Sequence, residues 1–262
     1  MNDASLRWAL APNPSPMTLD GTRTFVVGWR EPIVIDPGPA IPSHLDAILT
    51  LLAGATPSAI VLTHAHADHA GGAADLRAAT GAPVWLGAEA EGRLPISIDR
   101  WARDGDVLDC DAGRVRIVAT PGHAPEHLCV HWEGGAAPPA GALFVGDLMM
   151  GIGDTTLVAP PDGNLAEYLR SLDRVESLEA SLLLPAHGPP IEDPAEAIGR
   201  YREHRRQRVA QVREAIARTG TRDPDALVEL VYGDALHPAL RSAATGSVRA
   251  IIQYLAAHGD SE

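Results

Sequence analysis

The sequence of 262 residues contains no lysine, and all 21 of its basic residues are arginine. This absence excludes enzymes that form a lysine Schiff base, anchor pyridoxal phosphate on lysine, or use the lysine of a phosphate-binding loop. Cysteine is almost as scarce, since only Cys110 and Cys129 are present. Two cysteines do not make a disulfide framework, and we interpret both as small buried hydrophobic side chains.

Long apolar runs and an excess of positive charge are missing as well. No run approaches the roughly 20 apolar residues that a membrane span needs, and the N-terminus lacks the basic start and apolar segment of a signal peptide. We therefore expect a protein of the cytoplasm without a membrane partner. The formal net charge of -13 means that the chain as a whole repels nucleic acids and anionic membranes.

Short runs rich in valine, isoleucine and leucine predict buried β-strands. Helical patterns lie between some of them, at residues 43–52 with Ser43 as the N-cap, at 68–80 and at 165–178. Strands outnumber helices and come both singly and in hairpin-like pairs, which favours an α/β fold with mixed sheets. The strand-like runs are RTFVVG, PIVIDPG, AIVLTH, APVWLG, RVRIVATPGH, HLCVHWE, ALFVGD and SLLLPAHG.

A region of different character begins near Asp193. This residue can cap a helix, Pro194 suits the first helical turn, and the helical pattern then continues to Thr219 and Gly220. The last part of the chain is therefore expected to be a small helical appendage. Its further helices are expected from residue 224, at 237–244 and at 247–258.

Four of the strand-like runs lead directly into side chains that can bind metal ions. Loops at one edge of a sheet are where a rigid scaffold presents reactive groups, so these runs can bring seven ligands to one edge. The ligands are His64, His66, Asp68 and His69 after AIVLT, His123 after RVRIVATPG, Asp147 after ALFVG and His187 after SLLLPA.

The spacing within the first group suits two metal ions. Residues i and i+2 of an extended segment point the same way, so His64 and His66 can hold one ion. Asp68 and His69 fall where the chain turns into a helix and can face a second ion. Two ions about 3.5–4 Å apart need a shared ligand, and Asp147 is the candidate. Imidazole and carboxylate ligands suit zinc first, with iron or manganese as alternatives.

A lone histidine is more often structural than a ligand, and this alternative applies to several positions. The density of the segment HAHADH after a buried strand argues against it there. We interpret as structural the remaining histidines outside the motifs, namely His44, His131, His204, His237 and His258.

The motifs HAHADHAGG, TPGH, GD and PAHG, in that order, resemble the motif set of the metallo-β-lactamase superfamily. The resemblance covers roughly residues 10–195 and implies an αββα sandwich with the metals at one edge of the sheets. It also implies roles for the ligands. His64, His66 and His123 would bind the first ion, Asp68, His69 and His187 would bind the second, and Asp147 would bridge the two.

A second resemblance concerns the two ends of the chain. NPSPMTLDGTRTFVVG and YREHRRQRV are similar to the β-lactamase-like endoribonuclease branch, known from mitochondria, and its bacterial relatives. That branch has a winged-helix-like C-terminal domain. The resemblance therefore implies a metallo-β-lactamase-like catalytic domain over residues 1–195 and a helical, winged-helix-like domain over residues 196–262.

The expected reaction is hydrolysis by a hydroxide that bridges two zinc ions, since the metals lower the pKa of bound water to about 7 or below. This hydroxide would attack a carbonyl carbon or a phosphorus, and one metal would polarise the oxygen that gains charge. Asp68 is the candidate to orient the hydroxide and accept its proton. His127, four residues after His123, is a candidate donor to the leaving group, with a structural role as the alternative.

Two substrate classes need the full set of seven ligands. A small ester or thioester is the interpretation that we prefer, and a single-stranded RNA is the alternative. Residues 200–222 hold eight arginines against Glu203 and Glu214, a local net charge of +6 that can hold phosphates. The alternative for this segment is a solvated helix face, and the two substrate classes differ on whether it faces the metal cleft.

Two further activities fit the residues less well. A mononuclear-iron oxidoreductase, such as a persulfide dioxygenase, would leave Asp68, His69 and His187 without a metal ion. β-Lactam hydrolysis is disfavoured, because the lactamase classes of the superfamily place a cysteine, or no bridging ligand, at the position of Asp147. A bridging aspartate instead resembles the glyoxalase II, lactonase and nuclease branches.

Overall fold

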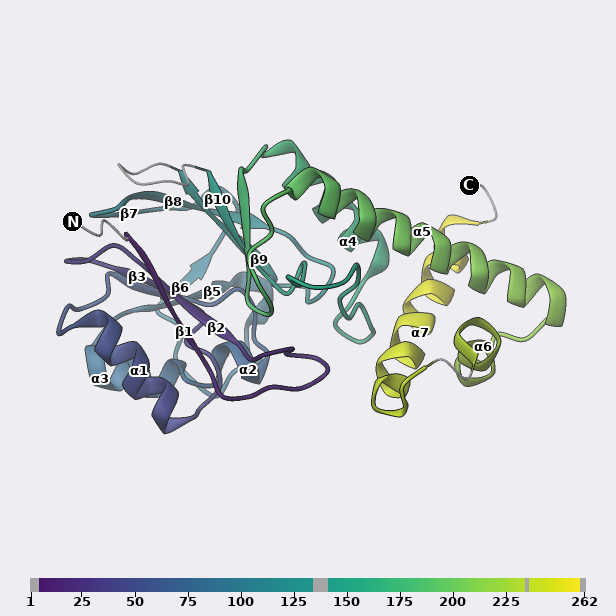
Figure 1. Ribbon diagram of the computed structural model, residues 1–262, viewed down its shortest axis with the longest axis horizontal. Helices are drawn as coiled ribbons and strands as arrows, with labels where there is room; N and C mark the ends of the chain where they lie inside the picture. Colours follow the sequence, from purple (N-terminus) through teal and green to yellow (C-terminus); the bar gives the residue numbers. More distant parts are fainter. Residues whose placement is uncertain (1–4, 134–140, 234–235, 260–262) are drawn as a thin grey trace.

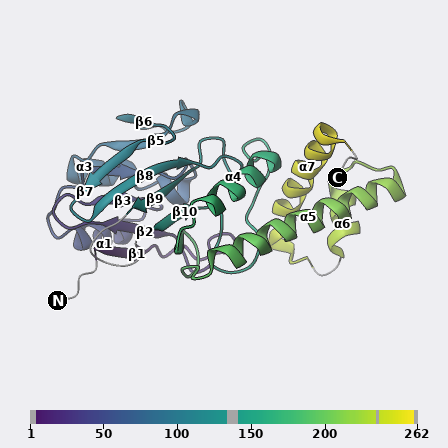
Figure 2. The same ribbon diagram turned by 90° about the horizontal axis from the view of Figure 1, so that it is seen from above.

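Two β-sheets lie face to face, and helices cover the outer side of each sheet (Figure 1, Figure 2). This computed structural model describes residues 5–133, 141–233 and 236–259. The arrangement confirms the αββα sandwich that the motifs imply. Every helix among the described residues is too short or too polar to span a lipid bilayer.

The first sheet contains six strands, whose order in space is their order in the chain: β1 (Leu6–Leu10), β2 (Arg23–Val27), β3 (Ile33–Ile35), β4 (Ala59–Val61), β5 (Val84–Gly87) and β6 (Arg100–Ala102). β1 to β3 pair antiparallel, whereas β3 to β6 run parallel. Parallel strands need crossover connections. The α-helices within these connections are α1 (Pro42–Leu52), α2 (Ala67–Ala70) and α3 (Ala73–Thr80).

The second sheet has the order β11-β10-β9-β8-β7 and is antiparallel except at one edge. There β11 pairs parallel with β10, because α4 (Leu165–Ser177) crosses over between them. The strands are β7 (Val107–Cys110), β8 (Gly113–Ala119), β9 (Leu128–Glu133), β10 (Ala142–Gly146) and β11 (Leu182–Pro185).

The alternation of side chains along the strands builds the layers. In β2, Phe25 enters the core between the two sheets, whereas Val26 packs on the outer side with α1 and α3. In β10, Phe144 faces the same inner core, at 5.0 Å between ring centroids from Phe25, whereas Leu143 faces α4. Both faces of each central strand are therefore buried, as their continuous apolar runs predict.

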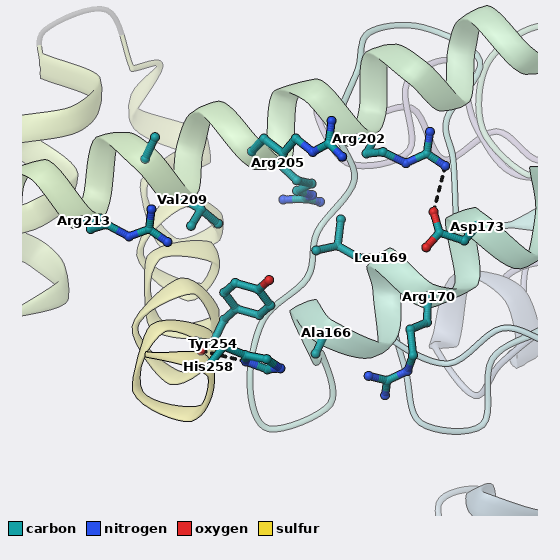
Figure 3. Close-up of a pocket in the computed structure, with 12 residues that line it drawn as sticks. Ala166, Leu169, Arg170, Asp173, Arg202, Arg205, Val209, Arg213, Tyr254 and His258 are labelled. Carbon is teal, nitrogen blue, oxygen red and sulfur yellow. Dashed lines mark hydrogen bonds and ion pairs between the residues drawn. The ribbon is translucent and has the colours of Figure 1, made fainter. Parts of the chain in front are cut away.

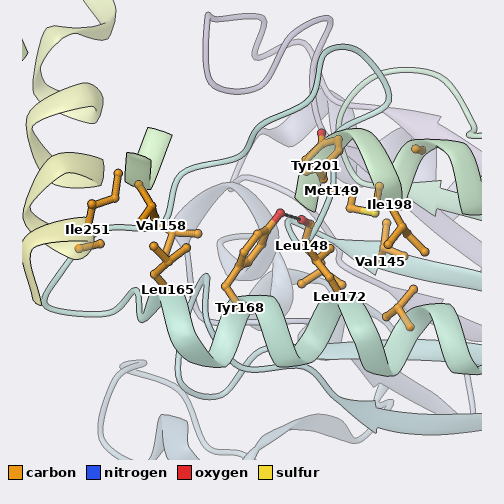
Figure 4. Close-up of a cluster of buried hydrophobic side chains, with 14 of the residues drawn as sticks. Val145, Leu148, Met149, Val158, Leu165, Tyr168, Leu172, Ile198, Tyr201 and Ile251 are labelled. Carbon is orange, nitrogen blue, oxygen red and sulfur yellow. Dashed lines mark hydrogen bonds between the residues drawn. The ribbon is translucent and has the colours of Figure 1, made fainter. Parts of the chain in front are cut away.

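The C-terminal region continues the outer core of the second sheet. It consists of α5 (Pro194–Thr219), α6 (Pro224–Tyr232), a 3₁₀ turn at Pro238–Leu240 and α7 (Arg241–His258), with no strand among its described residues. Figure 4 shows Tyr168 of α4 within this cluster, where its hydroxyl donates to the Leu148 carbonyl at 2.9 Å. Tyr201 of α5 and Ile251 of α7 join the same cluster, so the helices share one core with the sandwich.

Helix α5 starts and stops as the sequence predicts. The Asp193 side chain accepts from the Glu196 amide at 3.0 Å, Pro194 occupies the first turn, and Gly220 closes the helix in the left-handed conformation. Three other helix expectations were wrong. Ser43 is not an N-cap, because α1 begins at Pro42 after Ile41.

The remaining two corrections concern glycines. Residues 68–80 form two helices rather than one, separated at Gly71 and Gly72. Conversely, residues 241–258 form one helix, although helices were expected at 237–244 and 247–258. Gly246 lies within α7 and does not end it. A Cβ at this position would lie 2.7 Å from the Ala159 Cβ, so the glycine permits close packing of the helix against Ala159.

Candidate metal centre

The candidate ligands come from both sheets and meet at one edge of the sandwich. After β4 of the first sheet, His66 precedes α2 in extended backbone, and Asp68 and His69 lie in the single turn of α2. The expected change from extended chain to helix therefore falls between the two pairs of ligands. Three strands of the second sheet, β8, β10 and β11, lead to the remaining candidate ligands His123, Asp147 and His187.

Three imidazoles converge in the first group. His66 Nδ1 lies 2.9 Å from His64 Nε2 and 3.1 Å from His123 Nε2. The ligand atoms of these three residues and of Asp147 all lie within 4.8 Å of one another. Burial lowers the pKa of both His64 and His123, so these rings are held neutral, the form in which imidazole binds a metal ion.

Two imidazoles and a carboxylate form the second group. Asp68 Oδ2 lies 3.4 Å from His187 Nε2 and 3.7 Å from His69 Nε2. The two rings are buried, whereas about a third of the Asp68 side chain is exposed. The second group is thus closed on the protein side and open toward solvent at Asp68.

The two oxygens of Asp147 face different groups. Its Oδ1 lies 3.2 Å from both His69 Nε2 and His187 Nε2, in the second group. Its Oδ2 lies 3.6 Å from His123 Nε2, in the first group. A carboxylate with one oxygen directed to each of two groups has the geometry that a bridging ligand requires.

Unpartnered atoms test whether this site suits metal ions. Among the described residues, His69 Nε2, His187 Nε2 and Asp147 Oδ1 are buried and, although Oδ1 lies 3.2 Å from each nitrogen, none of the three has a hydrogen bond of suitable geometry. Buried polar atoms without partners are rare, because each costs about 1–3 kcal/mol. A cation between them would satisfy all three atoms, so the site fits a metal ion.

The opposite nitrogens of the rings have protein partners. His123 Nδ1 donates to the Leu157 carbonyl at 2.7 Å, and His187 Nδ1 donates to the Gly21 carbonyl at 3.1 Å. A carbonyl only accepts, so each ring carries its hydrogen on Nδ1 and leaves Nε2 for a metal ion. The same division of roles holds at His69, where Nδ1 contacts a carboxylate.

That carboxylate belongs to Asp36, which the sequence analysis did not identify. Asp36 Oδ2 lies 2.8 Å from His69 Nδ1 and accepts from the Thr63 hydroxyl at 2.7 Å, while Oδ1 accepts from the Thr63 amide at 2.7 Å. Only 2% of Asp36 is exposed. PIVIDPG shows an aspartate after a strand, but no local signal connects it with a histidine 33 residues later.

The loop after Asp36 also fixes α2. The Gly38 amide donates to the His69 carbonyl at 2.9 Å, and the Gly72 amide donates to the Gly38 carbonyl at 2.8 Å. A Cβ on Gly72 would lie 2.9 Å from the Pro37 carbonyl oxygen. The glycine pair after α2 therefore lets the backbone of the ligand helix pack directly against this loop.

The charges of the second group depend on one another. Burial alone would lower the pKa of His69, but the carboxylates of Asp147 and Asp36 raise it well above the usual value. Burial likewise opposes a proton on His187, yet Asp147 and Asp68 raise its pKa to about 9. Without a metal ion these rings hold protons, and a bound cation would take the place of that positive charge.

A second unforeseen network lies behind His66. Its Nε2 is 3.7 Å from Asp162 Oδ2, which accepts from Arg93 at 2.6 Å. Arg93 also lies 3.5 Å from Glu126 Oε1, which accepts from the Ala65 amide at 3.1 Å. The network orients the exposed side of His66, and its members are too far apart in the chain for a motif to reveal them.

His127 is buried behind the candidate ligands. Its Nε2 accepts from the Asp147 amide at 3.2 Å, and its Nδ1 contacts the Thr120 hydroxyl at 2.9 Å. Burial lowers the pKa of His127 to about 3, so the ring is neutral. With both nitrogens engaged, this geometry suits the structural role that the sequence left as the alternative to proton donation.

The histidines expected to be structural lie outside both groups. His44 of α1 contacts the Thr24 hydroxyl at 2.8 Å, and His237 caps the 3₁₀ turn by accepting from the Ala239 amide. The others are His131 on β9, His204 on α5 and His258 at the end of α7.

Two adjoining cavities give access to the centre. The first, which we call the metal cleft, has a volume of about 140 Å³ and is lined by His66, Asp68, His123 and Asp147 together with Met17, Met150, Thr156 and Leu157. The second, which we call the apolar groove, has a volume of about 390 Å³. It shares the last four of those residues with the cleft and extends to α5, α6 and α7.

Comparison with known proteins places these features in a family. The model of the metallo-beta-lactamase superfamily matches residues 18–187. The lactamase-like protein aptB of Emericella nidulans is 34% identical over 206 residues, which are 78% of this chain and 62% of the fungal protein. The chain thus spans about three fifths of the length of that relative. A beta-lactamase-like protein 2 homolog of Caenorhabditis elegans is 28% identical over 267 residues, covering 99% of this chain and 86% of the nematode protein.

Solved structures share the fold. A metallo-beta-lactamase family protein of Thermus thermophilus superposes with a TM-score of 0.80 at 22% identity, covering 97% of this chain and 94% of the other. A protein solved in a di-iron-bound form superposes with a TM-score of 0.56 at 28% identity, covering 71% of this chain and 94% of the other. The first similarity includes the C-terminal helices.

Proposed function

The chain belongs to the metallo-beta-lactamase superfamily, whose members are generally metal-dependent hydrolases, and on this premise we propose that it is a dinuclear zinc hydrolase of small esters or thioesters. The observation that carries the two-metal proposal is the orientation of Asp147. One of its oxygens faces the nitrogens of His69 and His187, and the other faces His123. A single-metal centre would give the second oxygen no such role.

In this proposal each of the two groups of residues would hold one metal ion. The imidazole nitrogens and the carboxylates suit zinc first, and the related protein in a di-iron-bound form keeps iron as an alternative. When bound, the metal pair supplies Lewis acidity and a water that is acidic enough to act as a nucleophile at neutral pH. His64, His66 and His123 would hold the first ion, Asp68, His69 and His187 the second, and Asp147 both.

The chain supplies the acid–base and positioning groups. Asp68 lines the cleft and is about a third exposed, whereas the side chain of Asp147 is largely buried, so Asp68 can accept the proton of the nucleophile. His127 accepts a hydrogen bond from the Asp147 amide and thereby fixes the position of the candidate bridging carboxylate. We assign His127 as a positioning residue. Leu157 serves twice, because its carbonyl orients His123 while the residue also lines the cleft.

The apolar groove supports the ester or thioester over a polar substrate. More than half of its lining residues are apolar, and two of its side chains, Ile152 and Met17, are 61% and 40% exposed. Exposed aliphatic side chains beside a reactive centre are typical of a binding site for an apolar group. The groove continues from the metal cleft, so an acyl chain in it would place its carbonyl beside the candidate ligands.

A series of acyl thioesters tests this proposal. We expect the zinc-loaded protein to hydrolyse acetyl, butyryl, hexanoyl and octanoyl thioesters of one thiol, with kcat/KM rising by up to about fourfold for each methylene that the groove buries. Thiol release is the measurement, and Asp147→Ala is the inactive control. No thioester hydrolysis by protein that holds two zinc ions would reject this substrate class.

Single-stranded RNA is the second candidate, and one observation favours it. Arg205 and Arg208 of α5 line the apolar groove, so part of the arginine-rich segment does face the cavity beside the metal cleft. A labelled single-stranded RNA incubated with zinc-loaded protein tests this alternative. Cleavage by the wild type but not by Asp147→Ala would assign phosphodiester hydrolysis, and intact RNA would leave the ester or thioester as the substrate class.

A further inference from the structure

A third cavity, of about 600 Å³, lies between α4, α5 and α7 (Figure 3). It shares only Arg205 with the apolar groove and no residue with the metal cleft. Its volume lies in the range of sites that bind small organic molecules. We call it the arginine pocket, and neither of the reactions considered above uses it.

Positive charge is concentrated in this pocket. Five arginines and one aspartate line it among the described residues, although the chain as a whole has a net charge of -13. Arg202 is neutralised by Asp173 at 2.8 Å and Glu176 at 2.7 Å. Arg206 is exposed and, within the described ranges, has neither an ion pair nor a hydrogen bond. The excess of guanidinium groups over carboxylates attracts anions.

Arg205 is a buried cation without a counter-ion. Only 3% of it is exposed, and its guanidinium lies 4.9 Å from the centre of the Tyr168 ring and donates to the Thr156 carbonyl. No carboxylate of the described chain pairs with it, and its Nε has no hydrogen-bond partner there. Burying an unpaired charge is costly, so a bound anion would supply the partner that the protein does not.

Aromatic and apolar side chains complete the pocket. At the α7 wall, the rings of Tyr254 and His258 stack at 4.4 Å between centroids with an angle of 21° between their planes. Leu169 of α4 and Val209 of α5 line the pocket between this pair and the arginines (Figure 3). A flat ring can stack on the aromatic pair while a linked anion contacts the guanidinium groups.

We propose that the arginine pocket binds a phosphate ester that carries a planar ring, which is the chemistry of a nucleotide. The phosphate contacts Arg205 and Arg206, and the ring packs against Tyr254 and His258. Arginine is suited to phosphate because its planar fork forms two parallel hydrogen bonds. A free mononucleotide or the end of a single-stranded RNA can supply this chemistry. The proposal does not depend on the reaction at the metal centre.

Calorimetric titration of the zinc-loaded full chain tests the proposal with three probes. AMP has both the ring and the phosphate, adenosine lacks the phosphate, and ribose 5-phosphate lacks the ring. We expect AMP to bind at least about tenfold more tightly than either of the other two. Equal binding of AMP and ribose 5-phosphate, or no binding of AMP, would overturn the proposal.

Charge reversal at an exposed arginine locates the site. Arg206→Glu should weaken the binding of AMP at least about tenfold, because a carboxylate that repels the phosphate replaces a guanidinium that contacts it. Arg222→Glu is the matched control, since it makes the same charge change outside the pocket and should leave AMP binding unchanged. Both variants should retain wild-type thioester hydrolysis. Equal AMP affinities in the two variants would show that AMP binds elsewhere and would contradict the proposal.

Two further measurements separate the ring from the phosphate and identify the source of the ligand. His258→Ala, at the exposed end of α7, should weaken the binding of AMP about threefold or more and leave the binding of ribose 5-phosphate unchanged. If it weakens both equally, the proposed ring position is wrong. A short single-stranded RNA with a 5′-phosphate then competes with AMP if the site accepts a strand end, and it does not compete if the site accepts only the free nucleotide.

Discussion

His69 Nδ1 and Asp36 Oδ2 lie 2.8 Å apart, with both side chains almost completely shielded from solvent. This contact fixes the ring so that Nε2 faces Asp147 in the second group. Asp36 itself is fixed by Thr63, which precedes the ligand segment by one residue. The first sheet therefore orients the candidate ligand His69 of α2 through a residue that lies behind the centre.

Asp36→Asn should weaken zinc binding in the second group about 10- to 100-fold, as substitutions of partners of metal-bound histidines generally do. Asparagine keeps the shape and tolerates the backbone φ of 49° at this position. Zinc titration with a competing chelator measures the change. Asp111→Asn is the control, because Asp111 caps the backbone of Trp29 and Arg30 and lies outside both ligand groups. Equal zinc affinities in both variants would contradict the orienting role.

Asp68→Ala and His64→Ala should each lose most turnover, by about hundredfold or more, while the protein stays folded. Each removes a candidate ligand, and Asp68→Ala also removes the proposed proton acceptor. Steady-state hydrolysis measures turnover, and circular dichroism checks the fold. Asp46→Ala, on α1 outside both ligand groups, should be fully active. Near-complete activity in either ligand variant would reject the mechanism.

Zinc binding to the metal-free protein should release protons and strengthen as pH rises. Burial lowers the pKa of His187, but the carboxylates of Asp147 and Asp68 raise it to about 9. This ring is therefore protonated at neutral pH. A zinc ion must displace that proton, and the cost falls as pH approaches 9. Calorimetry in buffers of different ionisation enthalpy counts the protons. An affinity that does not change between neutral pH and pH 9 would contradict this coupling.

Ile152→Asp should raise KM for octanoyl thioesters more than for acetyl thioesters, because Ile152 lines the apolar groove and is largely exposed. The expected effect on kcat/KM for the longest chain is about tenfold. Leu230→Asp provides a matched control, since Leu230 is also exposed but lies on α6 outside the groove lining. If the two variants behave alike, the acyl chain does not occupy the groove.

Strands buried on both faces were predictable, including the edge strand β11, whereas edge strands with a half-exposed pattern were not. The eight apolar runs coincide with β2 to β5 and β8 to β11. The missed strands, β1, β6 and β7, all lie at an edge of a sheet. Their half-exposed patterns, such as the alternation of exposed and buried residues in β7, leave too few apolar residues to form a recognisable run.

The convergence of the candidate ligands was predictable because they follow strands in short motifs, but the residues that contact them from behind were not. Asp36 and Glu126 contact the segment of candidate ligands from 33 and 61 residues away in the chain. Such pairs depend on how the sheets pack, and no local spacing encodes them. The same reason applies to Gly246, whose role in α7 depends on the approach of Ala159.

Mass spectrometry of the purified chain after zinc loading and desalting counts the zinc ions that each chain retains. We expect two zinc ions per chain in the wild type, and fewer in Asp147→Ala because both groups lose a candidate ligand. One zinc ion per folded wild-type chain, or a content unchanged in Asp147→Ala, would contradict a dinuclear centre bridged by Asp147.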